Sequence, residues 1–281
     1  MREVVICADS TCDLPDYLVQ QKDIIITPLS ILLGEDSYLD GVEIAPPDIY
    51  AYVNHTGVLP KTAAVPPGTY YELFSRLTEE GKEVVHIGLS SAISSSYQNA
   101  VVAASEFPNV HCVDSKSLCT AMGLLVLKAC DFRDAGMDAK KIAAKVTRLV
   151  PKVSTTFVLN TLEFLHKGGR CSGVARFGAN VLGIKPSIAM TPEGTLEVSK
   201  KYRGKLDMVY RQYINDCLAD VHKIDLSRIV IANSGIYRRY LQNGWRDVLT
   251  LATGVQPNPD LAVGSLILAN KNLGVKTIED L

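Results

Sequence analysis

The chain has 281 residues and a mass of 30.6 kDa, which is enough for one large domain or two modest domains with their own cores. Apolar residues make up 47% of it and charged residues 21%, proportions typical of a globular protein, so disorder is not expected. The formal net charge is −1, and a chain without a basic excess is a poor candidate for binding the phosphates of a nucleic acid.

Neither the N-terminus nor the apolar stretches predict export or membrane insertion. The longest apolar stretch, Cys119–Ala129, already contains Lys128 and is too short to span a bilayer. At the N-terminus, Glu3 occupies a region where a signal peptide needs positive charge, and a strand-like pattern begins at Val4. We therefore expect a cytoplasmic protein.

The cysteines show no pattern of chemical use. Their number is odd, no pair forms a CxxC motif, and no histidine–cysteine cluster has the spacing of metal ligands. Several lie in apolar runs, where a free cysteine acts as a small apolar residue. We predict reduced core thiols and no metal site. The seven are Cys7, Cys12, Cys112, Cys119, Cys130, Cys171 and Cys217.

In the first half of the chain, short apolar runs alternate with amphipathic segments of helix length. The predicted strands are Val4–Ala8, Ile24–Ile26, Leu29–Leu33, Val84–Gly88 and Val110–Val113. The predicted helices are Gly68–Leu77, Ser94–Ala104, Leu118–Asp131 and Asp138–Val150. Such alternation predicts an α/β domain with a Rossmann-like parallel sheet and helices on both of its faces.

The second half of the chain has a different pattern. Two strand-like runs, Lys185–Met190 and Thr195–Lys200, flank the turn sequence T-P-E-G, which is a hairpin signal. The other predicted elements are strands at Thr155–Leu159 and Ile229–Ala232, and helices at Leu162–Lys167, Lys205–His222, Tyr237–Leu251 and Pro259–Ala269. We predict a domain boundary near Pro151, with an N-terminal α/β domain over residues 1–151 and a C-terminal α/β domain with a mixed sheet over residues 152–281.

The segment Gly88–Tyr97 contains five serines and lies between a predicted strand and a predicted helix. Backbone N–H groups at a helix start have no intrahelical partner, and here they would face the crevice at the carboxyl edge of the sheet. Together with the hydroxyls, at the positive end of the helix dipole, they suit a small anion such as a carboxylate. The alternative is that these serines are ordinary helix caps. A GxSxG elbow would need glycine at Ala92, and no nucleotide-binding loop is present.

Three further features have a functional and a structural interpretation. Thr62 precedes a loop stiffened by prolines, so its hydroxyl is either aimed at a ligand or part of a helix-entry loop. Arg170 follows a glycine pair and either reaches a phosphate or carboxylate or lies in a solvated loop. The five histidines form no readable triad, and we interpret His86 and His111, within strands, as satisfied core or edge groups.

Six short segments form a pattern that none of them carries alone. They are D-S-T-C-D-L at Asp9–Leu14, T-A-A-V-P-P-G at Thr62–Gly68, L-S-S-A-I-S-S-S-Y at Leu89–Tyr97, G-G-R at Gly168–Arg170, I-K-P at Ile184–Pro186 and K-Y-R-G at Lys201–Gly204. In this order they resemble the motifs D-S-x-x-D-L, T-S-Q-P-S-P-G, L-S-S-x-L-S-G-T-Y, G-G-R, I-K-P and K-x-R-G of the DegV family.

The resemblance implies two α/β domains with one long-chain fatty acid buried between them and no other cofactor. In the FakB type of this family, the bound acid is phosphorylated on its carboxylate by a separate ATP-using fatty acid kinase subunit, of the FakA type. The implied function is therefore that of a non-catalytic lipid-binding carrier in bacterial phospholipid metabolism. Its expected partners are the fatty acid and the kinase subunit, and a transient membrane contact is compatible with this role.

The resemblance also assigns roles to individual residues. It implies that the hydroxyls of Thr62 and Ser94 and the backbone N–H of Ser95 bind the fatty-acid carboxylate, and that Arg170 and Arg203 face the kinase or a phosphate. Three departures from the family pattern concern the head-group site. The loop after the threonine lacks the family's Ser and Gln, Ser95 replaces a glycine, and Asn258–Ala262 stands where the family often has H-x-G-P-G.

Two other classes of function stay open. One is an enzyme, either a serine hydrolase that uses Ser91 or Ser94, or a subunit like that of dihydroxyacetone kinase acting on a small substrate. The other is a binding module for a different ligand or partner, for instance a regulator.

Overall fold

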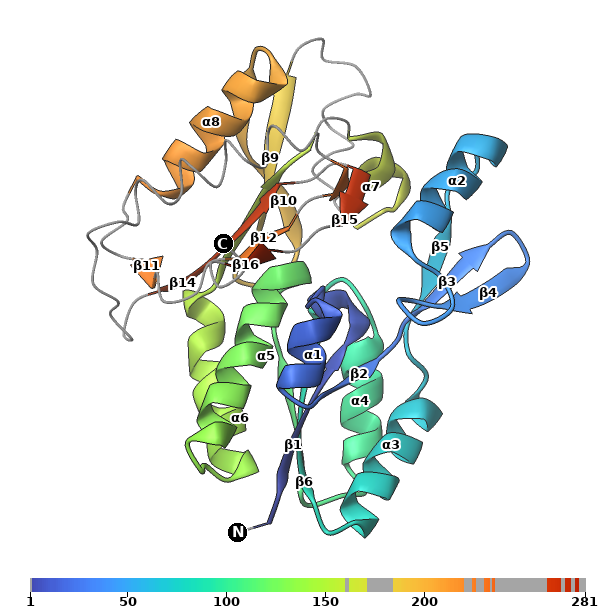
Figure 1. Ribbon diagram of the computed structural model, residues 1–281, viewed down its shortest axis with the longest axis vertical. Coiled ribbons are helices and arrows are strands. Elements are labelled where there is room, and N and C mark those ends of the chain that lie inside the picture. Colours follow the sequence, from blue (N-terminus) through green and yellow to red (C-terminus); the bar gives the residue numbers. More distant parts are fainter. Residues whose placement is uncertain are drawn as a thin grey trace. The chain divides into compact units, whose positions relative to one another are not determined.

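The computed structural model describes residues 2–159, 162–170, 184–219, 224–225, 230–232, 234–235, 262–268, 271–273 and 276–277 (Figure 1). The chain divides into two compact units. The first comprises Met1–Pro151 with Pro192–Gly194, and the second comprises Lys152–Thr191 with Thr195–Leu281.

A parallel sheet forms the centre of the first unit. Its strands are β1 (Val4–Asp9), β2 (Ile24–Thr27), β6 (Glu83–Gly88) and β7 (Val110–Asp114), in the order β2-β1-β6-β7. All neighbouring pairs run parallel, with Cys7 opposite His86 and Gly88 opposite Asp114. Because both faces of the sheet are covered, β1 is buried along its whole length, which explains its continuous apolar run.

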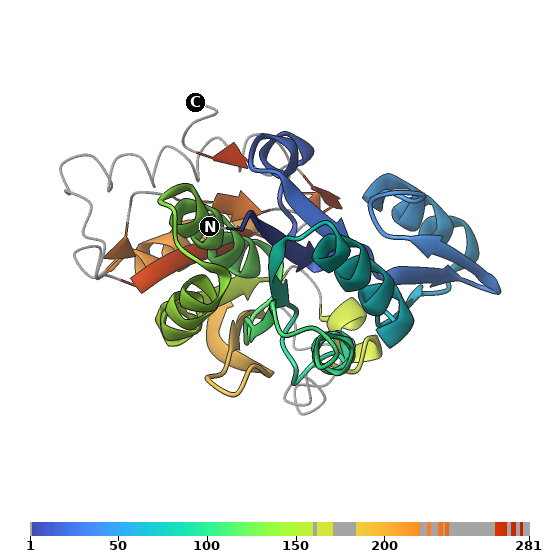
Figure 2. The ribbon, with the colours of Figure 1, turned by 90° about the horizontal axis from the view of Figure 1, so that it is seen from below.

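Helices cover both faces of this sheet, as the sequence predicts. They are α1 (Asp16–Gln21), α3 (Pro67–Glu79), α4 (Ser96–Ala104), α5 (Cys119–Asp134) and α6 (Ala139–Leu149), with short 3-10 helices η1 (Ser10–Cys12) and η2 (Val150–Lys152). The pair α5 and α6 lies on one side of the strands, and the pair α3 and α4 lies on the other (Figures 1 and 2). The predicted α/β fold class is confirmed.

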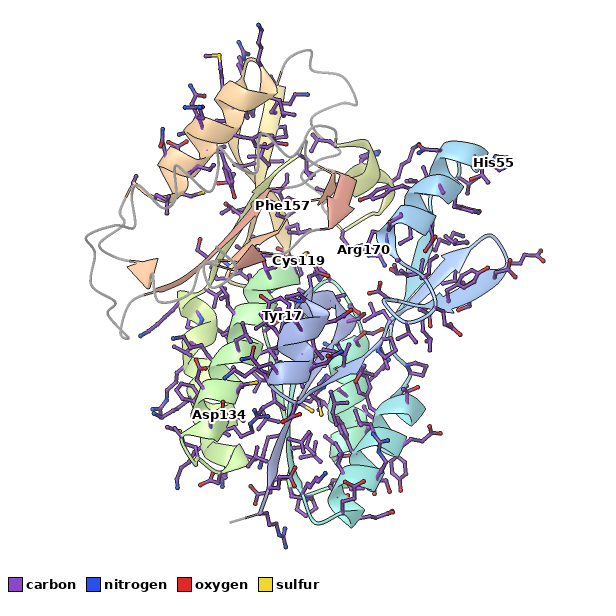
Figure 3. All side chains as sticks on the ribbon, viewed as in Figure 1. Tyr17, His55, Cys119, Asp134, Phe157 and Arg170 are labelled. Atoms are coloured by element: carbon purple, nitrogen blue, oxygen red, sulfur yellow. The ribbon has the colours of Figure 1, made fainter. Side chains whose placement is uncertain are left out.

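Helix α5 packs very closely against η1. Figure 3 labels Cys119 and Asp134 at the two ends of this helix. A Cβ atom added to Gly123, within the first two turns, would lie 2.6 Å from the backbone oxygen of Cys12. Glycine at this position is therefore what allows the helix to approach the segment after β1.

The first unit also contains a small antiparallel sheet, of which only the strand at Leu29–Leu33 was predicted. It consists of β3 (Ser30–Leu33), β4 (Asp36–Leu39) and β5 (Lys61–Ala63), in the order β4-β3-β5, and it is accompanied by α2 (Pro46–Thr56). Thr62 was predicted to lie in a loop, but it lies on β5 opposite Ile31. The sequence Lys-Thr-Ala has no apolar alternation, and β5 exists because β3 supplies a hydrogen-bonding edge.

The second unit contains a mixed sheet, as predicted. Its strands are β8 (Ser154–Val158), β9 (Ile184–Met190), β10 (Leu196–Arg203), β12 (Val230–Ala232), β14 (Ala262–Leu268) and β16 (Lys276–Thr277), with β11 (Ile224–Asp225) paired to β14. Strand β14 runs parallel to β8 and β12, whereas β9 runs antiparallel to β8 and β10. The predicted hairpin is therefore confirmed. The remaining elements are β13 (Ser234–Gly235), β15 (Lys271–Leu273), α7 (Glu163–Lys167) and α8 (Leu206–Cys217).

One predicted helix in this unit is wrong. Residues 262–268 of the segment predicted as a helix over Pro259–Ala269 form strand β14. Their sequence, A-V-G-S-L-I-L, is a short apolar run, and a strand buried in a sheet cannot be told from a buried helix by such a run. The helix predicted over Tyr237–Leu251 lies outside the described residues. In the part of the chain that the structure describes, no helix is both long and apolar enough to cross a membrane.

Candidate functional site

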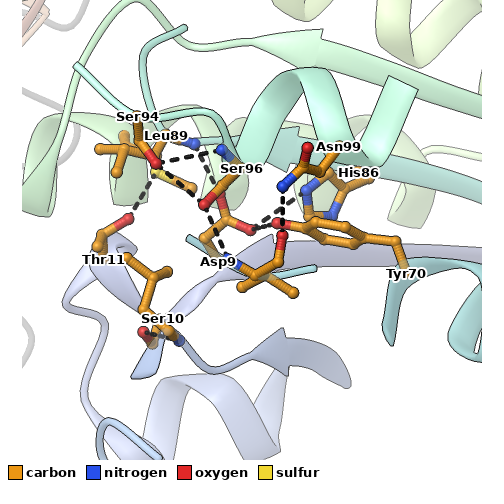
Figure 4. A network of polar contacts seen from close by, with 12 residues as sticks. Asp9, Ser10, Thr11, Tyr70, His86, Leu89, Ser94, Ser96 and Asn99 are labelled. Atoms are coloured by element: carbon orange, nitrogen blue, oxygen red, sulfur yellow. Dashed lines mark hydrogen bonds and ion pairs between the residues drawn. The ribbon is translucent and has the colours of Figure 1, made fainter. Parts of the chain in front are cut away.

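The serine-rich segment lies where the sequence predicts, between the end of β6 and the start of α4 (Figure 4). A tight turn precedes the helix, because the backbone N–H groups of Ile93 and Ser94 donate to Ser90 O at 3.1 and 3.2 Å. Ser94 is half-buried and Ser95 is exposed. The turn therefore presents hydroxyl and N–H groups at the N-terminal end of α4, where the helix dipole is positive.

Ser96, which was not among the predicted site residues, connects this turn to the segment after Thr62. The Ser96 hydroxyl oxygen accepts from the Ser94 hydroxyl at 3.0 Å and from the backbone N–H of Val65 at 3.3 Å. On the next turn of α4, the side-chain amide of Asn99 donates to Val65 O at 2.8 Å. These bonds fix the segment that follows β5 on the first turns of α4.

The structure thus places the three predicted carboxylate-binding residues as follows. Ser94 and Ser95 immediately precede α4, and Thr62 is an exposed residue of β5, three positions before the tethered Val65. Ser95 has φ −83° and ψ −2°, a conformation open to any residue, so replacing the family's glycine causes no backbone strain. The side chain of Ser95 makes no cap hydrogen bond. Carboxylate binding by these three residues stays a prediction.

A buried polar cluster lies behind this helix start (Figure 4). The carboxylate of Asp9, at the end of β1, accepts from the Tyr70 hydroxyl at 2.5 Å and from the backbone N–H of Leu89 at 2.8 Å. Nε2 of His86 lies 3.4 Å from the same carboxylate. The side chains of Asp9, Tyr70 and His86 are fully buried.

The charge of Asp9 is stabilised in this apolar environment by its donors. Burial alone would raise the pKa of Asp9, but His86, the Tyr70 hydroxyl and the Leu89 N–H together hold it below its ordinary value. Conversely, burial and the neighbouring Asp9 carboxylate raise the pKa of Tyr70 far above its ordinary value. Asp9 is therefore a buried anion and Tyr70 a neutral donor to it. An aspartate at the end of a fully apolar strand was the sequence signal for this cluster.

The structure also shows what surrounds Ser91. The hydroxyl of Ser91 accepts from Lys116 Nζ at 2.9 Å, and Lys116 Nζ also lies 2.9 Å from the Asp114 carboxylate. Burial would raise the pKa of Asp114, but Ser91 and Lys116 hold it below its ordinary value. Lys116 Nζ donates to the Ser91 hydroxyl and is paired with Asp114, so this contact gives Ser91 a hydrogen-bond donor and not the base that a serine nucleophile requires.

The two arginines predicted to face a partner lie in the second unit. Arg170 follows α7 and is exposed, and its guanidinium donates to the nearby Gly168 O at 2.6 Å. Arg203 is the exposed last residue of β10, opposite Ile184. Within the described residues, neither guanidinium has a carboxylate partner. Their partner-facing role stays a prediction.

Two predictions about other polar groups can be compared with the structure. The six cysteines in the described ranges are free thiols, and no group of three or more His, Cys, Asp or Glu in those ranges could hold a metal ion. His86 is a core residue, as predicted, and its Nε2 is paired with the Asp9 carboxylate at 3.4 Å, although neither ring nitrogen meets hydrogen-bond geometry with a described residue.

The described fold is that of an α/β protein with hydroxyl and N–H donors at the carboxyl edge of its parallel sheet. A family model, described as "Uncharacterised protein, DegV family", matches residues 3–234. The chain belongs to the DegV family.

Relatives and solved structures agree with this assignment. A DegV domain-containing protein of Clostridium acetobutylicum is 32% identical over 222 residues, which cover 78% of each chain. Another, of Clostridium perfringens, is 30% identical over 260 residues, covering 90% of this chain and 93% of the relative. A solved structure, described as "Fatty Acid Binding of a DegV family Protein from Thermus thermophilus", superposes with a TM-score of 0.79 at 26% identity, covering 96% of this chain and 92% of that chain.

Proposed function

We propose that the protein binds one long-chain fatty acid and holds its carboxylate at the start of α4. The observation that carries the proposal is the half-buried Ser94 hydroxyl beside the backbone N–H of Ser95 at the helix start, next to a segment tethered through Val65. The fatty-acid binding described for the Thermus thermophilus relative supports the same ligand.

The geometry at this helix start suits a carboxylate. One carboxylate oxygen can accept from the Ser94 hydroxyl and from the Ser95 N–H, because both lie at the positive end of α4. Thr62 lies on β5, three residues before Val65. The N–H and the carbonyl of Val65 are both hydrogen-bonded to side chains of α4, so the Thr62 hydroxyl belongs to a different element from Ser94 but to one that is tethered to the same helix. In this proposal Thr62 supplies the second side of the clamp.

The tail and the head group contribute differently to the binding free energy. Each buried methylene contributes about 0.8 kcal/mol, so a tail of about 14 methylenes contributes on the order of 11 kcal/mol before ordering costs. A hydrogen bond to a charged carboxylate contributes about 1.5–3 kcal/mol. Burial of the tail therefore sets the affinity, while Ser94, Ser95 and Thr62 set the orientation and the preference for an acid.

We further propose that the protein is a carrier without catalytic activity of its own, and that a separate fatty acid kinase subunit phosphorylates the bound acid. The exposed Arg170 and Arg203 support this proposal, because a guanidinium fork without a carboxylate partner can bind a phosphate or an acidic protein surface. The division into two domains, residues 1–151 and 152–281, is part of the same proposal.

A binding experiment with matched ligands and variants tests the head-group assignment. The lipid-free protein is titrated with laurate and with methyl laurate, which share a tail and differ in charge. The wild-type protein is expected to prefer the acid, and Ser94→Ala to reduce that preference by roughly ten- to a hundredfold, the equivalent of one charged hydrogen bond. Ser105→Ala is the control, because its hydroxyl donates to Val102 O at the other end of α4. Equal binding of acid and ester by the wild-type protein would exclude the clamp.

A further inference from the structure

The two sides of the proposed clamp are joined by a pair of polar side chains that the clamp itself does not use. Ser94 lies on the turn before α4, whereas Thr62 lies on β5, a strand of the small antiparallel sheet. Between these two sides, Ser96 and Asn99 of α4 are hydrogen-bonded to the backbone of Val65. The proposed function does not by itself explain why two polar side chains are placed there.

Both backbone groups of Val65 are bonded to α4. Its N–H donates to the Ser96 hydroxyl oxygen at 3.3 Å, and its carbonyl accepts from the side-chain amide of Asn99 at 2.8 Å. Ser96 is fully buried and Val65 is 1% exposed, so water does not compete for the bond between them. The two side chains are three positions apart and therefore lie on the same face of the helix. We call these two hydrogen bonds the Val65 tether.

Strand β5 depends on this tether for its position. It has three residues, all of them exposed, and it is paired with β3 at the end of the strand order β4-β3-β5. Among the described strands, none belongs both to this sheet and to the parallel sheet. A short edge strand without buried side chains has little local stability of its own. Thr62 is three positions before Val65, so the tether sets where the Thr62 hydroxyl lies relative to α4.

Ser96 also contacts the other side of the clamp. Its hydroxyl oxygen accepts from the Ser94 hydroxyl at 3.0 Å, and its backbone N–H donates to Ser94 Oγ at 3.2 Å (Figure 4). One residue is thus bonded both to Ser94 and to the segment that follows Thr62. Asn99 differs, because within the described residues its side chain is bonded to Val65 and not to the serine turn. A change at Asn99 therefore affects the Thr62 side alone.

We infer that Ser96 and Asn99 are positioning residues that hold Thr62 where its hydroxyl can bind the carboxylate. Both sides of the clamp then reach the same carboxylate, and the site selects an ionised acid over a neutral ester. The inference rests on the proposed function and deepens it, because it assigns acid selectivity to two residues that are not themselves part of the clamp.

The tether matters for the head group more than for the tail, because hydrogen bonds depend on geometry. A donor–acceptor pair weakens steeply beyond roughly 3.5 Å or below an angle of about 120°. Burial of apolar surface is non-directional, so it tolerates a displacement of one strand. Loss of the tether should therefore weaken binding of the acid and leave binding of its methyl ester nearly unchanged. A general loosening of the fold would weaken both ligands by the same factor.

The dissociation constants of laurate and methyl laurate, measured on the lipid-free protein, test the inference in Asn99→Ala. The preference for the acid is expected to fall by roughly tenfold, as in Thr62→Val, which is the equivalent of one hydrogen bond to a charged group. The affinity for methyl laurate should stay close to that of the wild-type protein. Gln98→Ala is the matched control, because it removes an exposed amide from the adjacent position of α4.

A double-mutant cycle shows on which side of the clamp the tether acts. Asn99→Ala and Thr62→Val should be non-additive in their effect on acid preference, because the first displaces the hydroxyl that the second removes. Asn99→Ala and Ser94→Ala should be closer to additive, since the Asn99 side chain is not bonded to the serine turn. An unchanged acid preference in Asn99→Ala, or full additivity with Thr62→Val, would overturn the inference.

A second measurement uses the wild-type protein and does not depend on the folding of a variant. If the tether favours binding of the acid, the acid must stabilise the tether by the same factor. Exchange of the Val65 amide hydrogen, followed by NMR, is expected to be slower with laurate than with methyl laurate. Equal exchange in the two complexes would overturn this inference alone. Equal affinity of the wild-type protein for acid and ester would overturn the proposed head-group site instead.

Discussion

Replacement of Tyr70 by phenylalanine isolates one hydrogen bond in the buried cluster. The Tyr70 hydroxyl donates to the Asp9 carboxylate at 2.5 Å, and both side chains are fully buried. Hydrogen bonds to a charged group contribute about 1.5–3 kcal/mol, and Tyr70→Phe is expected to lower the free energy of unfolding by that amount at neutral pH. Tyr71→Phe is the control, because that ring is on the same helix but 49% exposed.

The pH dependence of this effect identifies Asp9 as its cause. The folded-state pKa of Asp9 lies below its ordinary value, so its contribution to stability is present above the unfolded pKa and is lost as pH falls through the folded pKa. Tyr70→Phe brings the folded pKa nearer the unfolded one, and the difference between the two proteins should shrink below about pH 4. Urea unfolding followed by circular dichroism at several pH values measures it. Equal stabilities of Tyr70→Phe and Tyr71→Phe at neutral pH would show that the Tyr70–Asp9 hydrogen bond does not stabilise the fold.

Three further predictions concern packing, the partner surface and catalysis. Gly123→Ala is expected to destabilise the protein by about 1–3 kcal/mol in urea unfolding, because its Cβ would lie 2.6 Å from Cys12 O, whereas Gly68→Ala, with open space around it, should not. Arg170→Ala should leave the amount of bound lipid unchanged and lower acyl-phosphate formation with a fatty acid kinase by about tenfold. Arg148→Ala, at another exposed arginine, is the control and should leave acyl-phosphate formation unchanged. Loss of lipid from Arg170→Ala would contradict the assignment. The pure protein should hydrolyse p-nitrophenyl laurate no faster than buffer, and activity abolished by Ser91→Ala would show that the protein is an enzyme.

The parallel sheet could be predicted from the sequence because its signals are local. Apolar runs such as Val4–Ala8 alternate with amphipathic segments, and this alternation reflects burial on both faces of β1 and on one face of helices such as α6. The serine run could be placed at a helix start for the same reason. Strand β14 was wrongly predicted as a helix, because seven apolar or small residues bounded by turn signals fit a buried strand and a buried helix equally well.

The inner part of the candidate site could not be predicted, because it depends on contacts between distant segments. Asp9 and Tyr70 are 61 positions apart, and Val65 and Ser96 are 31 positions apart. Strand β5 forms only because β3 lies beside it, so the strand position of Thr62 has no local signal either. A histidine within an apolar strand looks the same in a sequence whatever its ring contacts, which is why the pairing of His86 with Asp9 could not be predicted.

Native mass spectrometry of the purified protein shows whether it carries a single long-chain fatty acid. We expect a species heavier than the apoprotein by the mass of one long-chain fatty acid, which is released on denaturation and identified as a free acid. A ligand-free protein that also fails to take up added laurate, or a bound molecule without a carboxylate, would contradict it.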